Sequence, residues 1–497
     1  MVKVFLSRCH ELLSMKKYRW LVVTVALISM VCHMVFSTPV MGANDAYCRF
    51  NQNEINLKTE LRNRAFTSNN SQTMREYQEV VQRHSQMLRD CRNRNWLKEQ
   101  GIWLRIYPCD VLDGSIEKVL DRIVDLGYNT VYLEVFFDGR VLLPKNGNNT
   151  VWRSVVEQPG YENRDLYAET LQKGRSRGLK MYAWLFSLNY GYSYSVRGDR
   201  TDVLALNGKG ENSIGYVDDG SQTFVDPYHP VARQDYQRLL QAVLQRRPDG
   251  VLFDYIRYPR GAGTYSVASK VKDLWIYGSA SRQALLARAL NNQGRWILQR
   301  YVDQGFINGG DLEQMRELYP NETMPLWQGR NPNSANNLSA LQLDLWYFTV
   351  AHAAQGVIEF LNFAVNQVRQ MGIPAGAVFF PEGNQPVGEI GFDSRVQPWD
   401  NFPHSLPEFH PMSYALCGSA SCIAQQVQTV ADEIPNVSNV KPVLAGFWGR
   451  SEGQRPSLEV QMEGIRQANR GIISISHFAY SWLEPEHTRE RRRSCNF

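Results

Sequence analysis

The sequence lacks several motifs that would assign it to a common enzyme class. It has no GxGxxG turn after its first strand-like segment, no HExxH or HxxxH pair among its 9 histidines, and no CxxC. These absences argue against a dinucleotide-binding sheet and leave a zinc amidase or deacetylase as a weaker alternative. We therefore expect neither a cofactor nor a metal. With 43% apolar and 21% charged residues, the chain is not disordered, collagenous or a coiled coil.

Positive charge is also scarce outside the N-terminus. The formal net charge is +5, but Lys3, Arg8, Lys16, Lys17 and Arg19 stand against Glu11 before residue 44. The rest of the chain is therefore close to neutral. This balance excludes an extended basic surface for nucleic acid and predicts no nucleic-acid partner.

The basic start leads into an uncharged segment, WLVVTVALISMVCHMVF, from Trp20 to Phe36. This segment is shorter than the roughly 20 apolar residues of a comfortable membrane span, and the small residues Gly42 and Ala43 follow it. The pattern predicts a secretory signal over residues 1–43, cleaved near Ala43, with an uncleaved anchor as the alternative. In both cases we expect the bulk of the chain to lie outside the cytoplasm, with membrane contact only through this segment.

Six of the 8 cysteines follow the N-terminal segment, and an oxidising compartment favours disulfides between them. Proximity in the sequence favours Cys417 with Cys422 and Cys48 with Cys91. The pair left over is Cys109 with Cys495. Buried free thiols are the alternative.

The residue composition and the hydrophobic pattern of the chain change near residue 100. Residues 44–100 are rich in Asn, Arg, Gln and Glu and predict a polar helical extension of two helices. Beyond it, β-rich segments alternate with helical patterns and glycine stops. The predicted strands are 101–106, 130–137, 180–186, 250–256, 376–382, 408–415, 441–448 and 472–483.

Eight strands separated by crossover helices predict an α/β fold, a (β/α)₈ TIM barrel over residues 101–485. Residues 261–374 form a helical insertion after strand four that includes a crossover helix, and 486–497 form a C-terminal tail. The competing fold, a doubly wound open sheet, lacks its glycine-rich turn.

Catalytic groups of such barrels stand at the carboxyl ends of the strands, where this sequence concentrates carboxylates and aromatic residues. Acetal cleavage needs one carboxyl as proton donor and a second, ionised one, while aromatic rings stack on sugars. The candidate catalytic residues are Asp254, Glu382 and Glu134. The candidate substrate-binding residues are Tyr255, Arg257, Tyr258, Asp138, Trp184, Asn189, Tyr414, Trp448, His477 and Trp482.

Each candidate also has a structural interpretation. Asp254 and Arg257 would form a bracing ion pair, Glu382 would cap a turn, and Glu134 would tune a neighbouring pKa or fix a strand. Each aromatic residue taken alone favours packing over sugar stacking. Asp226 and His229 are expected to shape the entry to the helix at 230–247.

Two adjoining segments carry a family resemblance: FVDPYHPVARQDYQRLL at 224–240 and DGVLFDYIRYPR at 249–260. They resemble the motif of bacterial glycosyl-hydrolase-like family 10, with weaker similarity at 126–144, 177–192 and 471–483. The resemblance implies a TIM-barrel envelope glycosidase acting on a bacterial envelope or extracellular glycan, with peptidoglycan strands favoured. It supports the motif residues Asp226, Asp254, Tyr255, Arg257 and Tyr258 as residues in or near the site.

Two departures from the family pattern leave the glycan open. Strand three runs into SLNYGY at 187–192 instead of an Asn-Pro-Tyr-Arg-like turn, and the loop after strand four is unusually long. The resulting hypothesis is a secreted or membrane-tethered glycoside hydrolase with a polysaccharide substrate. Asp254, held ionised by Arg257, would pair with Glu382 as proton donor, and Glu134 would assist or replace one of them. The alternative is a non-catalytic glycan-binding or envelope-scaffolding barrel. The sequence does not predict an oligomeric state.

Overall fold

A computed structural model describes residues 45–493 except 69, 218–219 and 404. The chain divides into two compact units, Met1–Cys48 and Arg49–Phe497, and the fold below is that of the second unit. The predicted signal or anchor over residues 1–43 and the tail cysteine Cys495 lie outside the described residues.

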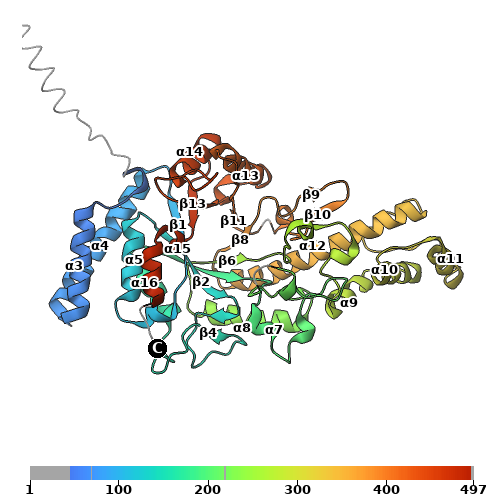
Figure 1. The fold of residues 1–497 in the computed structure, drawn as a ribbon, viewed down its shortest axis with the longest axis horizontal. Helices are drawn as coiled ribbons and strands as arrows, with labels where there is room; N and C mark the ends of the chain where they lie inside the picture. The colour runs from blue at the N-terminus through green and yellow to red at the C-terminus, as the bar shows by residue number, and fades with distance from the viewer. Residues whose placement is uncertain (1–44, 69, 218–219, 404, 494–497) are drawn as a thin grey trace, which may run out of the picture. The chain divides into compact units, whose positions relative to one another are not determined.

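Eight parallel strands form the barrel, and each lies within or next to a strand predicted from the sequence (Figure 1). They are β1 (Glu99–Leu104), β2 (Thr130–Phe137), β5 (Lys180–Phe186), β6 (Gly250–Asp254), β8 (Ala375–Phe379), β11 (Glu408–Pro411), β12 (Val443–Ala445) and β13 (Ser474–Phe478). Their order follows the chain, with β1 paired to β13. Parallel bridges from Phe409 to Val440 and from Met412 to Val443 close the gap between β11 and β12. This register confirms the predicted (β/α)₈ barrel.

Helices surround the barrel because their apolar residues recur at helical spacing. The crossover helices are α5 (Ser115–Asp125), α6 (Leu166–Arg175), α8 (Pro230–Leu244), α12 (Leu338–Gln370), α13 (Ala420–Glu433) and α14 (Leu458–Ala468). In α5 the buried face includes Ile116, Val119, Leu120 and Ile123. Gly127, with φ +84°, then turns the chain into β2.

The last predicted strand is shorter than expected. Residues 472–483 contain β13, then α15 (Tyr480–Leu483), and α16 (Pro485–Arg493) follows in the predicted tail. Short elements decorate the loops that leave the carboxyl ends of the strands: β3 (Arg140–Val141), β4 (Arg153–Ser154), α7 (Tyr192–Ser195), and an antiparallel sheet of β7 (Val267–Ala268), β10 (Gly391–Asp393) and β9 (Pro386–Val387).

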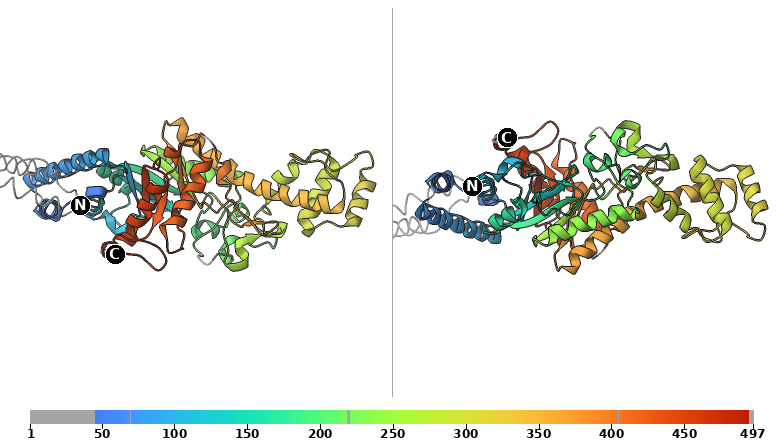
Figure 2. Two further views of the ribbon diagram at one scale, coloured as in Figure 1. Left: turned by 90° about the horizontal axis from the view of Figure 1, so that it is seen from above. Right: turned by 90° about the horizontal axis from the view of Figure 1, so that it is seen from below.

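The insertion after β6 contains α9 (Ser279–Ala287), α10 (Asn292–Gln304) and α11 (Gly309–Leu318), and α12 returns the chain to the barrel. Figure 2 shows these helices at the end of α12 that projects from the barrel. Among the helices of the described residues, α12 is long and apolar enough to suit a membrane span, but over half of that apolar window is buried. Its contacts with α8 and β8 make it a core helix of the fold.

The extension is a hairpin of α3 (Gln52–Ser68) and α4 (Ser71–Arg94) that docks on α5 through buried charges. The Asp121 carboxylate of α5 accepts hydrogen bonds from Arg62 Nη1 at 3.0 Å, Arg177 Nε at 2.9 Å and Tyr77 OH at 2.8 Å. Burial opposes ionisation of Asp121, but the charges of Arg177, Lys58 and Arg62 together hold its pKa below the usual value.

A second buried ionic cluster, here called the ionic plug, fills the amino-terminal end of the barrel. Lys441 Nζ lies 2.7 Å from Glu99 Oε2 and 2.8 Å from Glu408 Oε1. Glu408 also accepts a hydrogen bond from Tyr182 OH at 2.8 Å and contacts His410 Nε2 at 3.0 Å. This end of the barrel is therefore filled by carboxylates that already have partners.

Disulfides are present in the described residues. Cys417 and Cys422 form the predicted bond, which confirms that pairing. Cys48, Cys91 and Cys109 are also disulfide-bonded.

Candidate functional site

Two predicted carboxylates project into the carboxyl-terminal end of the barrel. Side chains alternate along a strand, so Glu134 of β2 follows Tyr132, and Asp254 ends β6 on the face of Leu252 and Gly250. Both carboxyls are buried, with Glu134 1% exposed and Asp254 7% exposed. Strand geometry therefore brings these two candidates to the mouth of the barrel.

Asp254 is held by two N–H donors. Trp184 Nε1 donates to Oδ2 at 3.1 Å, and the backbone N–H of Tyr255 donates to Oδ1 at 2.6 Å. Burial raises the pKa of Asp254 to about 6, against the lowering effects of the Tyr255 N–H, the Arg257 charge and the Trp184 N–H. Arg257 thus acts in the expected direction, but burial outweighs it, and Asp254 is ionised only above about pH 6.

The Arg257 guanidinium packs on an aromatic ring and bonds a backbone carbonyl instead of forming a direct ion pair with Asp254. It lies 4.6 Å from the centre of the Tyr255 ring, and its Nη1 donates to the Tyr258 carbonyl at 3.0 Å. Tyr255 adopts φ +52°, a left-handed conformation that is rare for an aromatic residue. Strain of this kind clusters at functional sites because the surrounding structure must hold it in place.

Glu134 is paired with Arg105, which is not among the residues predicted for the site. Arg105 Nη2 donates to Glu134 Oε1 at 2.9 Å, and Arg105 Nε donates to Oε2. Burial raises the pKa of Glu134 to about 7; Arg105 opposes this rise, while the charges of Asp138 and Asp254 add to it. Glu134, Asp138 and Asp254 therefore form one electrostatically coupled group. Asp138 has φ +44° and accepts a hydrogen bond from Ser221 Oγ at 3.4 Å.

Aromatic rings line the barrel beside these carboxyls. Trp184 meets Trp103 edge-on, with ring centres 4.8 Å apart, and lies 6.1 Å from Phe478. Phe478 in turn contacts Trp482, which is 42% exposed, and Tyr414. The Asp254 charge helps raise the pKa of Tyr414, so Tyr414 belongs to the same electrostatic neighbourhood. Trp184 is buried against Asp254, whereas the Trp482 side chain is partly exposed to solvent.

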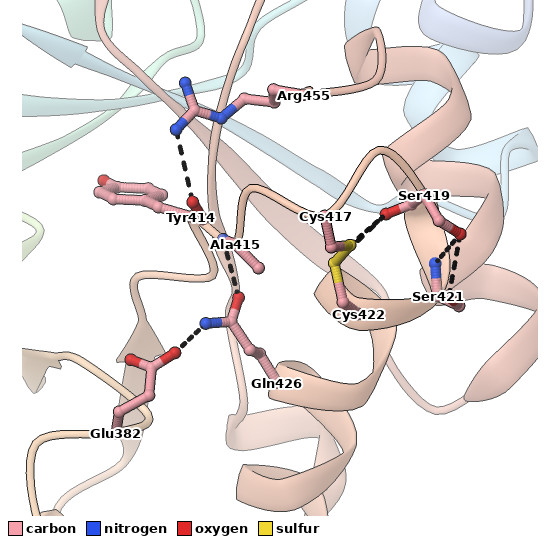
Figure 3. The surroundings of a disulfide bond; sticks show 9 residues. All are labelled: Glu382, Tyr414, Ala415, Cys417, Ser419, Ser421, Cys422, Gln426 and Arg455. Atoms are coloured by element: carbon pink, nitrogen blue, oxygen red, sulfur yellow. Dashed lines mark hydrogen bonds between the residues drawn. A yellow bond between two sulfur atoms is a disulfide. The ribbon is translucent and has the colours of Figure 1, made fainter. Parts of the chain in front are cut away.

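Glu382 occupies a separate sector of the same end of the barrel, beyond β8. Its carboxylate accepts a hydrogen bond from Gln426 Nε2 of α13, and Gln426 Oε1 accepts from the backbone N–H of Ala415 at 3.1 Å (Figure 3). The Cys417–Cys422 disulfide joins the loop after Ala415 to the first turn of α13. The Tyr414 segment and the disulfide thus position the amide that holds Glu382. Glu382 remains half-buried.

His477 and Trp448 lie away from the mouth, on the outer side of the barrel. Ser476 points inward and accepts a hydrogen bond from Trp103 Nε1 at 3.0 Å, so the next residue, His477, points outward. Its Nδ1 lies 2.7 Å from Tyr128 OH, and Trp448 Nε1 donates to the same hydroxyl at 3.2 Å. These two side chains pack between the barrel and its surrounding layer.

Other selected residues build the loops around the mouth. Asn189 is buried, and its Oδ1 accepts from the backbone N–H groups of Gly191 at 3.1 Å and Thr223 at 2.9 Å. Tyr258 is fully buried. Asp226 accepts from the backbone N–H groups of Tyr228 and Ser281, and His229 caps α8, as turn-forming residues would.

The residues missed from the sequence share one signal. Arg105 stands two positions after Trp103 and four after Gly101, where a Cβ would lie 2.6 Å from the Tyr132 ring inside the barrel. Strand alternation alone therefore predicts an inward Arg105, and the same reasoning selects Phe478. Within the described part of the chain, no group of three or more His, Cys, Asp or Glu side chains is arranged to hold a metal ion.

Residues 100–300 match the family described as Glycosyl hydrolase-like 10. The match confirms the resemblance expected from the segments around Asp254. It spans β1 to β6 and so includes Glu134 and Asp254, while Glu382 lies beyond it. A search of curated proteins finds no match.

Among solved structures, the chain is similar to the catalytic domain of a beta-amylase from Paenibacillus polymyxa, at 12% identity and TM-score 0.46 over 77% of this chain and 92% of that one. It is also similar to a GH42 beta-galactosidase, at 12% identity and TM-score 0.44, covering 78% and 51%. A hypothetical protein from Ruminiclostridium thermocellum shows 16% identity and TM-score 0.24, covering 32% and 78%. The barrel assignment rests on strand order and register, independently of these similarities.

Proposed function

We propose that the protein is an extracytoplasmic glycoside hydrolase that cleaves O-glycosidic bonds within glycan strands, with peptidoglycan strands as the favoured substrate. The observation that best supports this proposal is Asp254, a buried carboxyl at the mouth of the barrel. It accepts a hydrogen bond from Trp184, and its charge raises the pKa of Glu134. Perturbed carboxyls of this kind mark sites of acid–base chemistry. The family match over residues 100–300 supports the same reaction class. The N-terminal segment and the disulfides support the location.

The pKa, the bonding partners and the exposure of each carboxyl suggest its role. Asp254, with its pKa raised to about 6, is ionised at neutral pH and serves as nucleophile or base. Glu134 has both oxygens bound to Arg105, which leaves it poorly placed to protonate a leaving group. Glu382 is half-buried and serves as the proton donor. Glu134 tunes the charge of the site, and Trp482 offers its ring to a sugar.

The test measures reducing ends released from intact peptidoglycan, peptide-free peptidoglycan strands and common α- and β-glucans. Wild type is compared with Asp254→Asn, Glu382→Gln and the surface control Glu433→Gln. We expect one substrate to be cut by wild type and the control, and turnover to fall about 10²- to 10⁴-fold in the other two. A dinitrophenyl glycoside of the same sugar needs no leaving-group proton, so Glu382→Gln should cut it nearly normally while Asp254→Asn should not.

A second candidate is a barrel that binds glycans without cutting them. The observation in its favour is the Arg105–Glu134 pair, which neutralises one mouth carboxyl within the protein. Retention of a glycan by wild type and Asp254→Asn alike, with no reducing ends released, would replace the hydrolase by this function.

A further inference from the structure

The Cys417–Cys422 disulfide belongs to a series of contacts that ends at Glu382 (Figure 3). Cys422 and Gln426 are four residues apart on α13 and therefore share one face of that helix. Both contact the segment that follows β11. Cys422 is bonded to Cys417, and Gln426 Oε1 accepts a hydrogen bond from the backbone N–H of Ala415 at 3.1 Å. The segment and the helix are thus joined at two adjacent points.

Gln426 uses both ends of its amide group. Its oxygen is bonded to the Ala415 N–H, and its Nε2 donates to Glu382 Oε1. Because the oxygen and the nitrogen of one amide have a fixed relative geometry, the bond to Ala415 determines where the N–H donor points. No hydrogen bond to Glu382 Oε2 is found among the described residues, so this oxygen is the one left to carry a proton. The amide therefore orients the carboxyl without occupying both of its oxygens.

The segment around the disulfide has little other support from α13. Leu416 is 62% exposed, and residues 417–419 are also exposed. The Gly418 N–H donates to the Gln454 carbonyl at 2.7 Å, which ties the segment to the loop before α14. A single half-buried hydrogen bond, such as the one that Gln426 accepts, adds little net stability. The covalent link to α13 is therefore the contact most able to hold this arrangement.

We propose that Gln426 is a positioning residue for the proton donor Glu382, and that the Cys417–Cys422 disulfide keeps Gln426 in place. This inference rests on the proposed function, because the role of Gln426 is defined by the proton-transfer step. Acid catalysis depends on the placement of the donor, and a displacement of about 1 Å can cost about 100-fold in rate. The site thus works in full only while the disulfide is formed.

Reduction of the disulfide follows ordinary thiol chemistry. Cys417 is exposed, so a small dithiol can reach the bond. A thiolate of the dithiol attacks one sulfur and the dithiol is itself oxidised to a disulfide, while Cys417 and Cys422 receive two electrons and two protons and become thiols. The bonds of Glu382 and Gln426 are unchanged by this step, but the covalent link between the segment and α13 is lost.

The experiment compares two substrates that differ in their need for a proton. Peptide-free peptidoglycan strands, or the α- or β-glucan that wild type cuts, need a proton on the leaving group, whereas a dinitrophenyl glycoside of the same sugar does not. Gln426→Leu and the double variant Cys417→Ser/Cys422→Ser are tested in the full-length protein. We expect turnover of the glycan to fall about 10- to 100-fold in both. Turnover of the dinitrophenyl glycoside should stay within about twofold of wild type, whereas general loss of structure would lower both activities alike.

Gln425→Leu is the matched control, because Gln425 is an exposed glutamine of the same helix. It should keep both activities. Dithiol treatment should lower glycan turnover by wild type but not further lower that of the double serine variant. This comparison separates the Cys417–Cys422 bond from the bonds of Cys48, Cys91 and Cys109. Hydrogen exchange gives a readout independent of catalysis, since the Ala415 amide should exchange faster in both variants.

The outcomes separate this inference from the proposed function. Equal losses on both substrates, or no loss in Gln426→Leu, would overturn the role of Gln426 while leaving the hydrolase standing. Unchanged glycan turnover in the double serine variant would overturn the role of the disulfide. If wild type cuts neither substrate, the proposed function fails and the role of Gln426 in proton transfer fails with it. Faster exchange of the Ala415 amide in the double serine variant would then still show that the disulfide holds the contact with Gln426.

Discussion

Asp254 at the mouth of the barrel and Glu408 at its opposite end are both buried, yet their pKa values lie on opposite sides of the usual range. Burial raises the pKa of Asp254 to about 6. Burial also opposes ionisation of Glu408, but hydrogen bonding to His410 and the charge of Lys441 lower its pKa to about 2. Because burial also lowers the pKa of His410, that ring is neutral at pH 7, and Lys441 supplies the compensating charge.

The difference lies in how many donors and cations each end provides. Glu408 and Glu99 share Lys441, and each has another partner, Tyr182 for Glu408 and Lys180 for Glu99. Asp254 has two N–H donors and no cation in direct contact among its described hydrogen bonds and ion pairs. Satisfied carboxylates stabilise a fold, whereas undercompensated ones retain the capacity to react. Under the proposed function, the paired carboxylates and the reactive carboxyl therefore lie at opposite ends of the barrel.

The largest expected effect separates the two ends by activity. Asp254→Asn should lower turnover about 10²- to 10⁴-fold because it removes the ionised carboxyl of the proposed site. Glu408→Gln, the same chemical change at the other end, should leave kcat within about twofold and instead lower the unfolding midpoint. Turnover on the identified glycan and thermal unfolding of both variants check this. Equal activity loss in both would contradict the separation.

Stability should respond most strongly to loss of the shared cation. Lys441→Met leaves Glu99 and Glu408 buried with one cation fewer, and such changes cost about 3–5 kcal/mol. The control is Lys118→Met, whose partner Glu490 lies 3.0 Å away at an exposed site. Exposed pairs contribute about 0–1 kcal/mol. Urea unfolding of the two variants measures the difference. Similar losses of unfolding free energy in both would show that the ionic plug contributes no more stability than an exposed ion pair.

The pH dependence of stability should run in opposite directions at the two ends. Asp254 has a raised pKa, so its stabilising contribution is fully present below about pH 3.8 and is lost as pH rises through about 6. Asp254→Asn should therefore be more stable than wild type at pH 7, by up to about 3 kcal/mol, with the advantage gone near pH 4. Glu408 has a lowered pKa, so its contribution is present above about pH 4.5 and is lost as pH falls toward 2. Denaturant unfolding of wild type and Asp254→Asn between pH 4 and 8 tests the sign for Asp254, and unfolding of wild type and Glu408→Gln between pH 2 and 5 tests it for Glu408. An Asp254→Asn variant less stable than wild type at pH 7 would contradict the first prediction.

Much of the barrel was predictable from the sequence because each strand is a short β-rich segment that ends near a glycine or a helix signal. The prediction extended the last strand too far, since ISHFAYSWL continues the β-like composition of β13 into α15. Composition does not separate these two elements. The strand ends at Phe478 because the backbone turns at Ala479, and residue composition does not reveal that turn.

The candidate site was predictable where strand alternation was applied and missed where it was not. Asp254 and Glu134 follow from position and parity. The position of His477 late in β13 predicts a place at the mouth, but the inward Ser476 fixes His477 on the outer face of the barrel. The bond between Gln426 and Glu382 joins segments 44 residues apart and leaves no local signal in the sequence. The ionic plug is equally non-local, since its members begin different strands.

The smallest effect concerns how far Arg257 tunes the mouth. Its charge lowers the pKa of Asp254 although burial prevails, so Arg257→Gln should raise that pKa further. Activity that requires ionised Asp254 falls as pH drops through this pKa. The acid limb of kcat/KM should therefore lie near pH 6 in wild type and move up by about one unit or less in Arg257→Gln. Arg257→Lys restores the charge and should return the limb toward wild type, whereas a purely structural role would lower activity at every pH without moving the limb. An acid limb that stays near pH 6 in Arg257→Gln would remove Arg257 from the electrostatics of the mouth and leave it as a packing partner of Tyr255.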